Sequence, residues 1–185
     1  MLREELKAEE ATQRDVTILT ERRRYEIMKK YEFTDETKEV NGVVLHRIKA
    51  VRDFGSVKAG SLGGFIKKNS NLSHDGDAWV SDNARVSGDA WVSGDAWVSG
   101  NAQVSGDAFI KKITDILTVV VIESRDDFTS FYKNKDGGIS VACGCFSGNI
   151  DKFFEIVQEV HGDSKYGKIY KKCIELAKMQ IIVDD

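Results

Sequence analysis

Three histidines are the side chains of this chain best suited to general acid–base catalysis or to zinc binding: His46, His74 and His161. A neutral imidazole can accept a proton near neutral pH, and three imidazoles can hold a zinc ion. The three lie in different segments, so we expect no shared metal site. His74, next to the first of a series of repeats, is the one candidate for a catalytic base. A turn histidine without a catalytic task is the favoured interpretation.

Cys143-Gly144-Cys145 is the second pattern that could do chemistry. A structural zinc site needs four ligands and commonly has a C-x-x-C spacing, which is absent here. Residues i and i+2 of a strand share a face, so we interpret both cysteines as small side chains packing on a sheet. No phosphate-binding loop motif occurs either. We therefore expect no metal, no cofactor and no catalytic residue.

Six consecutive hexads fill residues 75–110, with the sequence DGDAWV SDNARV SGDAWV SGDAWV SGNAQV SGDAFI. Each ends in an aliphatic residue, with Ala two positions before it. A strict period of six is typical of a parallel β-helix. Each hexad then forms one side of a three-sided coil, with Val or Ile inside. Gly-Asp, Asp-Asn or Gly-Asn takes the corner, where a positive φ is tolerated.

Aromatic side chains take the outward position of four hexads: Trp79, Trp91, Trp97 and Phe109. A coil of 18 residues places Trp79 beside Trp97, and Trp91 beside Phe109. The third face is polar, with Arg85 beside Gln103. Aromatic residues left on a surface usually mark a contact. Coverage by the C-terminal part of the chain, self-association and a foreign partner are the three explanations that remain open.

The corners of the same coil carry acidic residues. Asp77 is expected to stack on Asp95, and Asp89 on Asp107, in rows with a spacing of about 4.8 Å. Such rows could imitate a phosphate backbone, although Asp is also simply a residue that turns prefer. Because the hexads hold six Asp and one Arg, this segment is not expected to grip nucleic acid itself.

The flanking segments indicate four parts. We expect a helical extension over residues 1–30, a β-hairpin over 31–56, a β-helix with its cap over 57–110, and a small α+β module over 111–185. Asn41-Gly42 is the hairpin signal. Helices are predicted near residues 150–160, capped by Asn149 or Ser147, and near 165–179. The predicted fold class is mainly β with α, built on a short left-handed parallel β-helix of hexapeptide repeats.

The odd number of cysteines and the absence of a secretion signal predict a reducing, cytoplasmic environment. No apolar run approaches the roughly 20 residues needed to span a bilayer, so no membrane partner is expected.

Several longer motifs resemble a family of phage and prophage proteins with variable numbers of hexapeptide repeats. They are KYEFTDETKEVNGVVLHRIKAVRDFG, the GSLGGFI turn, the hexads, SRDDFTSFYKNKDGGISVACGCFSGNIDKF and EVHGDSKYGKIYKKCIELAK. The likeness covers Met28 to about Ile181 and leaves residues 1–27 outside. The resemblance implies a phage setting and no assigned enzymatic activity.

By analogy with small acidic phage proteins, we expect a non-enzymatic inhibitor of bacterial antiviral defence. An anti-CRISPR protein that binds a Cas nuclease, or its nucleic-acid complex, in the host cytoplasm is the leading form of this prediction. The candidate partner-binding residues are the outward and corner residues of the hexads: Trp79, Trp91, Trp97, Phe109, Arg85, Asp77, Asp89, Asp95 and Asp107. The alternatives are an acyltransferase using His74, and a sponge for a nucleotide immune signal with a basic pocket from Arg47, Lys49, Arg52 and Lys58.

Overall fold

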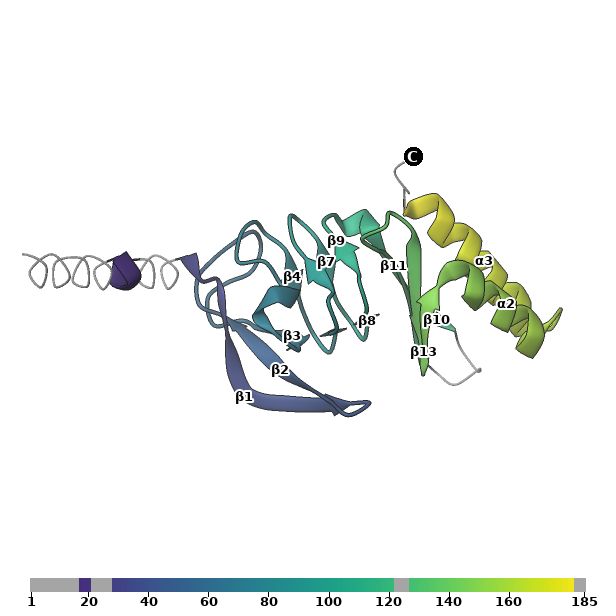
Figure 1. The fold of residues 1–185 in the computed structure, drawn as a ribbon, viewed down its shortest axis with the longest axis horizontal. Helices are drawn as coiled ribbons and strands as arrows, with labels where there is room; N and C mark the ends of the chain where they lie inside the picture. Colours follow the sequence, from purple (N-terminus) through teal and green to yellow (C-terminus); the bar gives the residue numbers. More distant parts are fainter. Residues whose placement is uncertain (1–16, 21–27, 122–126, 182–185) are drawn as a thin grey trace, which may run out of the picture.

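The computed structural model describes residues 17–20, 28–121 and 127–181. Residues 17–20 are helical, and the remainder of the predicted extension up to residue 27 lies outside the described residues. An N-terminal sheet, the hexads, and a C-terminal sheet covered by two helices follow one another along the long axis of the molecule (Figure 1). Among the described residues, no helix has the length and apolar character needed to cross a bilayer.

The N-terminal sheet starts with a long hairpin. Strand β1 (Tyr31–Val40) pairs antiparallel with β2 (Val43–Ala50). Between them, Asn41 and Gly42 have φ of 51° and 76°, the left-handed conformation that a two-residue hairpin turn requires. The hairpin predicted from these two residues is confirmed. Strand β3 (Leu62–Ile66) then joins β2 antiparallel and connects this sheet to the hexads.

The hexads contribute six strands of two residues each, and each of the first three pairs in parallel with the strand 18 residues later. They are β4 (Trp79–Val80), β5 (Arg85–Val86), β6 (Trp91–Val92), β7 (Trp97–Val98), β8 (Gln103–Val104) and β9 (Phe109–Ile110). The predicted neighbours Trp79 and Trp97, Arg85 and Gln103, and Trp91 and Phe109 are confirmed as paired residues. Their six aliphatic end residues are buried together with the alanines. We call residues 75–110 the hexad stack.

The prediction that a left-handed parallel β-helix defines the fold is wrong. The molecule is mixed β with few helices, and its sheets are separate and small. The largest sheet, in the order β1-β2-β3-β5-β8, mixes antiparallel and parallel pairs, and the next is antiparallel. The physical reason is strand length. Most residues of each hexad form corners, so the long strands and most of the backbone hydrogen bonds between strands come from the flanking segments.

The C-terminal part is an antiparallel sheet covered by two helices. Its strands are β10 (Ile116–Val121), β11 (Asp127–Lys133), β12 (Ile139–Cys143) and β13 (Phe146–Asn149), in chain order. Helices α2 (Ile150–His161) and α3 (Lys165–Gln180) confirm both predicted helices. The Asn149 side chain accepts a hydrogen bond from the Lys152 N–H and caps α2, one of the two caps predicted. Phe131, Val141 and Phe153 belong to the core between sheet and helices.

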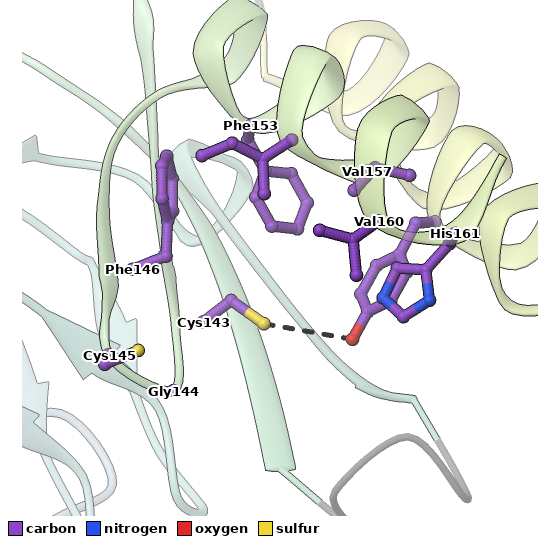
Figure 2. A pocket seen from close by; sticks show the side chains of 10 residues that line it. Cys143, Gly144, Cys145, Phe146, Phe153, Val157, Val160 and His161 are labelled. Carbon is purple, nitrogen blue, oxygen red and sulfur yellow. Dashed lines mark hydrogen bonds between the residues drawn. The ribbon is translucent and has the colours of Figure 1, made fainter.

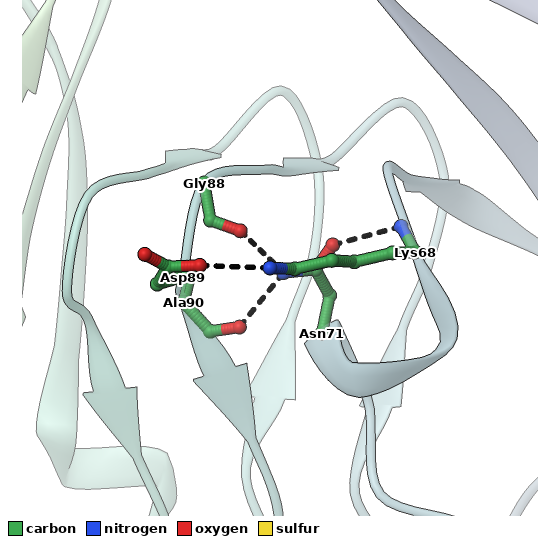
Figure 3. Close-up of polar contacts among 5 residues, drawn as sticks. All are labelled: Lys68, Asn71, Gly88, Asp89 and Ala90. Carbon is green, nitrogen blue, oxygen red and sulfur yellow. Dashed lines mark hydrogen bonds and ion pairs between the residues drawn. The ribbon is translucent and has the colours of Figure 1, made fainter.

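Both ends of the hexad stack are closed by the chain itself. At the first end, Asn71 Nδ2 donates to Ala90 O at 2.8 Å and to Gly88 O at 3.2 Å (Figure 3). At the far end, side chains of β11 accept from the last coil: Ser130 Oγ from the Gln103 N–H at 3.1 Å, and the Tyr132 hydroxyl from the Ser105 N–H at 3.4 Å. Backbone groups at the ends of the stack that already have hydrogen-bond partners are not available to pair with another chain. These contacts therefore disfavour end-to-end stacking of copies.

Candidate functional site

The four aromatic residues of the hexads divide into a buried and an exposed part. Trp79 is only 2% exposed, so the expectation that it faces outward is wrong. The Phe54 ring lies 5.3 Å from the Trp79 ring, and the Tyr31 ring lies 6.5 Å away, both edge-on. The cover therefore comes from the N-terminal side of the chain rather than from the C-terminal module. Trp79 is a core residue and offers no contact to a partner.

Trp97, paired with Trp79, is half-buried and packs against the same core. Its indole Nε1 donates to Ser81 Oγ at 3.2 Å. The hydrogen bond satisfies the polar end of the ring and fixes its orientation. Trp97 therefore contributes part of its face to the surface, but its position is set by intramolecular contacts.

The opposite pair remains accessible. Trp91 is 36% exposed, and its ring centroid lies 5.1 Å from that of Phe109. Lys111 Nζ lies 4.5 Å from the Phe109 ring centroid and 6.0 Å from that of Trp91, within range of a cation–π contact. Ile113, in the short helical turn that contacts β9, is 62% exposed. We call Trp91, Phe109 and Lys111 the Trp91 patch.

The predicted acidic corner residues Asp77, Asp89, Asp95 and Asp107 are all exposed. Asp89 does not stand as a bare charge, because Lys68 Nζ lies 2.7 Å from its carboxylate (Figure 3). The Lys68 hydrogen bond and charge hold the pKa of Asp89 below its ordinary value. The other three corner aspartates form no ion pair with a described residue. Of the four predicted corner residues, Asp77, Asp95 and Asp107 therefore keep carboxylates without an ion pair to a described residue.

Arg85 lies on the third side of the stack, beside Gln103, as predicted. It is half-buried and lines a groove between the β1–β2 hairpin and the β12–β13 turn. The aromatic pair Trp91 and Phe109 belongs to a different sheet of the stack. The predicted partner-binding residues thus do not form one continuous site.

The basic pocket suggested for a nucleotide is not assembled. Arg47 pairs with Glu36 at 3.2 Å, Lys49 with Glu32 at 3.4 Å, and Lys58 with Asp53 at 2.9 Å. The fourth residue, Arg52, donates from Nη2 to His74 O at 3.4 Å. Each cation is engaged with a different neighbour, so these four side chains do not present a common anion site.

His74 is held between the N-terminal strand and the first hexad. Its ring stacks on the Tyr31 ring with the centroids 4.3 Å apart, and its Nδ1 accepts from the Lys30 N–H at 3.2 Å. Burial, together with the nearby Lys30 charge, lowers the pKa of His74 below its ordinary value. These contacts give His74 a packing role. Within the described residues, no group of three His, Cys, Asp or Glu side chains could hold a metal ion.

A pocket of about 370 Å³ that the sequence did not indicate lies in the C-terminal module (Figure 2). Apolar side chains of α2, among them Phe153, line it together with both cysteines of the CGC sequence. Cys143 Sγ accepts from Thr129 Oγ1 at 3.1 Å and lies 3.9 Å from the Tyr170 hydroxyl. The lining residues are scattered between positions 143 and 170, so no local sequence pattern could have predicted the pocket.

The interpretation of the two cysteines as neighbours on one strand face is wrong. The chain turns at Gly144, whose φ is 56°, and Cys143 pairs with Phe146 across the hairpin. Cys143 therefore ends β12 and is half-buried, whereas Cys145 lies in the turn and is exposed. Glycine at the turn permits the positive φ that separates them.

In comparisons with known proteins, no family model and no curated protein matched the chain.

Proposed function

We propose that this protein is a non-enzymatic, phage-encoded interaction protein that inhibits bacterial antiviral defence. In this proposal it acts in the host cytoplasm by binding a defence nuclease of the Cas type through the hexad stack. The single observation that supports the proposal is the Trp91 patch, in which the Trp91 ring and the Lys111 side chain are exposed and the Phe109 ring beside them is half-buried. Tryptophan and other large aromatics are the residues that most often dominate protein–protein binding energy.

Two further features suit such a role. The closed ends hold the stack as a pre-organised unit, so little ordering entropy is lost on binding. The exposed carboxylates of Asp77, Asp95 and Asp107 lie at corners of the same stack, where they complement a basic channel that otherwise holds nucleic acid. Aromatic anchors would then supply affinity, and the acidic corners would supply orientation and association rate.

The experiment compares three forms of the protein in DNA-cleavage assays with a panel of purified, guide-loaded Cas nucleases. We expect the wild type to inhibit at least one of them, and Trp91→Ser with Phe109→Ser to lose the inhibition. Phe154→Ser is the matched control, because Phe154 is an exposed aromatic of α2 outside the hexads. Thermal unfolding of all three forms checks that each is folded.

Two outcomes would count against the proposal. No inhibition of any nuclease in the panel by the wild type would remove the Cas-type partner. Unchanged inhibition in the Trp91/Phe109 double variant would remove the Trp91 patch as the binding surface. Sedimentation velocity on the same samples tests self-association, since a dimer that dissociates only in the double variant would assign the patch to a second copy of the chain.

A further inference from the structure

Arg85 lies in a groove formed by three separate parts of the chain. The tip of the β1–β2 hairpin, the Arg85–Gln103 side of the hexad stack and the β12–β13 turn together enclose a cavity of about 180 Å³. Val40 and Val43 give it an apolar wall, and Ser105 and Ser147 place their hydroxyl oxygens 3.2 Å from each other beside it. Arg85 is the one charged residue in its lining.

Among the described residues, the guanidinium of Arg85 has no counter-ion. Its Nε is shielded from solvent and has no hydrogen-bond partner, and no described carboxylate forms an ion pair with it. Arg47 offers a comparison, because its Nε is also buried without a partner but its Nη1 pairs with Glu36. A partly desolvated cation without an anion is costly, so an anion that entered the groove would relieve an existing penalty.

We propose that this groove binds the carboxylate of a small aliphatic ligand. A single arginine matches a single negative charge, and its planar fork can hold both carboxylate oxygens at once. The valine wall suits a short hydrocarbon body. One hydroxyl of the Ser105–Ser147 pair donates to the other, and the remaining O–H is an additional donor for the ligand. The site is independent of the proposed function, because it lies on another side of the stack from the Trp91 patch.

The test follows the Nε–H resonance of Arg85 by NMR while the full-length protein is titrated with butyrate. We expect a saturable shift of this resonance with butyrate and none with butyramide, which has the same shape without the charge. Arg85→Gln should abolish the response of the neighbouring Gln103 and Ser105 amides. Glutamine is the residue that the next coil already carries at the paired position 103, so the substitution is compatible with the stack. Arg47→Gln is the matched control and should leave the titration unchanged.

The source of the carboxylate is distinguished by a second ligand, glutamate blocked at both ends. If blocked glutamate binds more tightly than butyrate, the natural ligand is a carboxylate side chain of a polypeptide. If butyrate binds more tightly, the natural ligand is a free acid. Three results would overturn the proposal: no saturable shift with either acid, an equal response to butyramide, or tighter binding of inorganic phosphate than of both carboxylates. The comparison of butyrate with butyramide uses the wild type and remains decisive even if Arg85→Gln fails to fold.

Discussion

Lys30 and Asn71 each donate side-chain hydrogen bonds to backbone carbonyls at the first edge of the hexad stack. The carbonyls that accept from Asn71 lie two hexads after those that accept from Lys30. Lys30 Nζ donates to Ala78 O at 2.7 Å, and Asn71 Nδ2 donates to Ala90 O at 2.8 Å. Each also donates to the carbonyl of the glycine two residues earlier, at 3.3 Å and 3.2 Å respectively. Carbonyls deeper in the stack accept from backbone N–H groups of the preceding coil, and these first-edge carbonyls have no such coil. One ammonium and one amide therefore take the place of a missing strand.

Replacing Asn71 by Leu should destabilise the protein, because the side chain keeps its volume but loses its two donated hydrogen bonds and the one that its Oδ1 accepts from the Lys68 N–H. Leaving buried carbonyls without a partner costs about 1–3 kcal/mol. The midpoint of urea unfolding should fall accordingly. Asn69→Leu changes an exposed residue of the same turn and should have little effect. Equal loss in both variants would show that the turn itself, and not the cap, is sensitive.

Lys30 predicts an unusual dependence of stability on pH. Its side chain is fully buried, and burial, with a smaller effect of the Arg52 charge, lowers the pKa of its ammonium from 10.5 to about 8. Between pH 8 and 10.5 the unfolded chain binds more protons at this site than the folded chain does, so its contribution to stability rises with pH. Below pH 8 the cost of burying the charge is constant.

The measurement compares the free energy of unfolding of the wild type and Lys30→Met across this pH range. Above pH 8 the free energy of unfolding of the wild type should increase relative to that of the variant, with a slope of at most about 1.4 kcal/mol per pH unit. Lys67→Met, at an exposed lysine, controls for general effects of alkaline pH. A difference between wild type and Lys30→Met that stays constant with pH would contradict the lowered pKa.

The two tryptophans Trp79 and Trp91 should respond differently to truncation. Trp79→Ala removes a buried ring packed against Phe54 and Tyr31, and such changes cost about 3–5 kcal/mol. Trp91→Ala removes a ring that is already partly in water and should cost clearly less. Thermal unfolding of the single variants provides the comparison. Similar losses for both would mean that the Trp91 patch is structural.

Glycine at a corner of the stack can be required by a positive φ or by a lack of space for a Cβ, and Gly94 and Gly100 differ in the second respect. Both have φ of 65°, so alanine at either position incurs a backbone cost of about 1–2 kcal/mol. A Cβ at Gly94 would lie 2.5 Å from Lys111 O, whereas a Cβ at Gly100 meets nothing within 4 Å. Gly94→Ala should therefore lower the unfolding temperature by more than Gly100→Ala. Equal decreases would indicate that the stack relaxes around residue 94 without further cost.

Local patterns in the sequence predicted the elements whose partners lie at a regular spacing. The period of six predicted which hexad residues pair and which point inward, because one offset of 18 residues applies to every coil. Asn41-Gly42 predicted the hairpin, and the helical spacing of apolar residues predicted α2 and α3. In each case the residues that determine the element lie within a short segment, or they recur at a constant spacing along the chain.

The remaining features depend on contacts between segments with no shared period. The sequence by itself determined the pairing of the hexads, the hairpin and the two C-terminal helices. Only the tertiary structure decided that the long flanking strands and not a β-helix dominate the fold, and that Trp79 is covered while Trp91 is exposed. It also decided that Arg85 lines a groove without an ion pair to any described carboxylate. The physical reason is that exposure and pairing of a side chain are set by whichever distant segment packs over it.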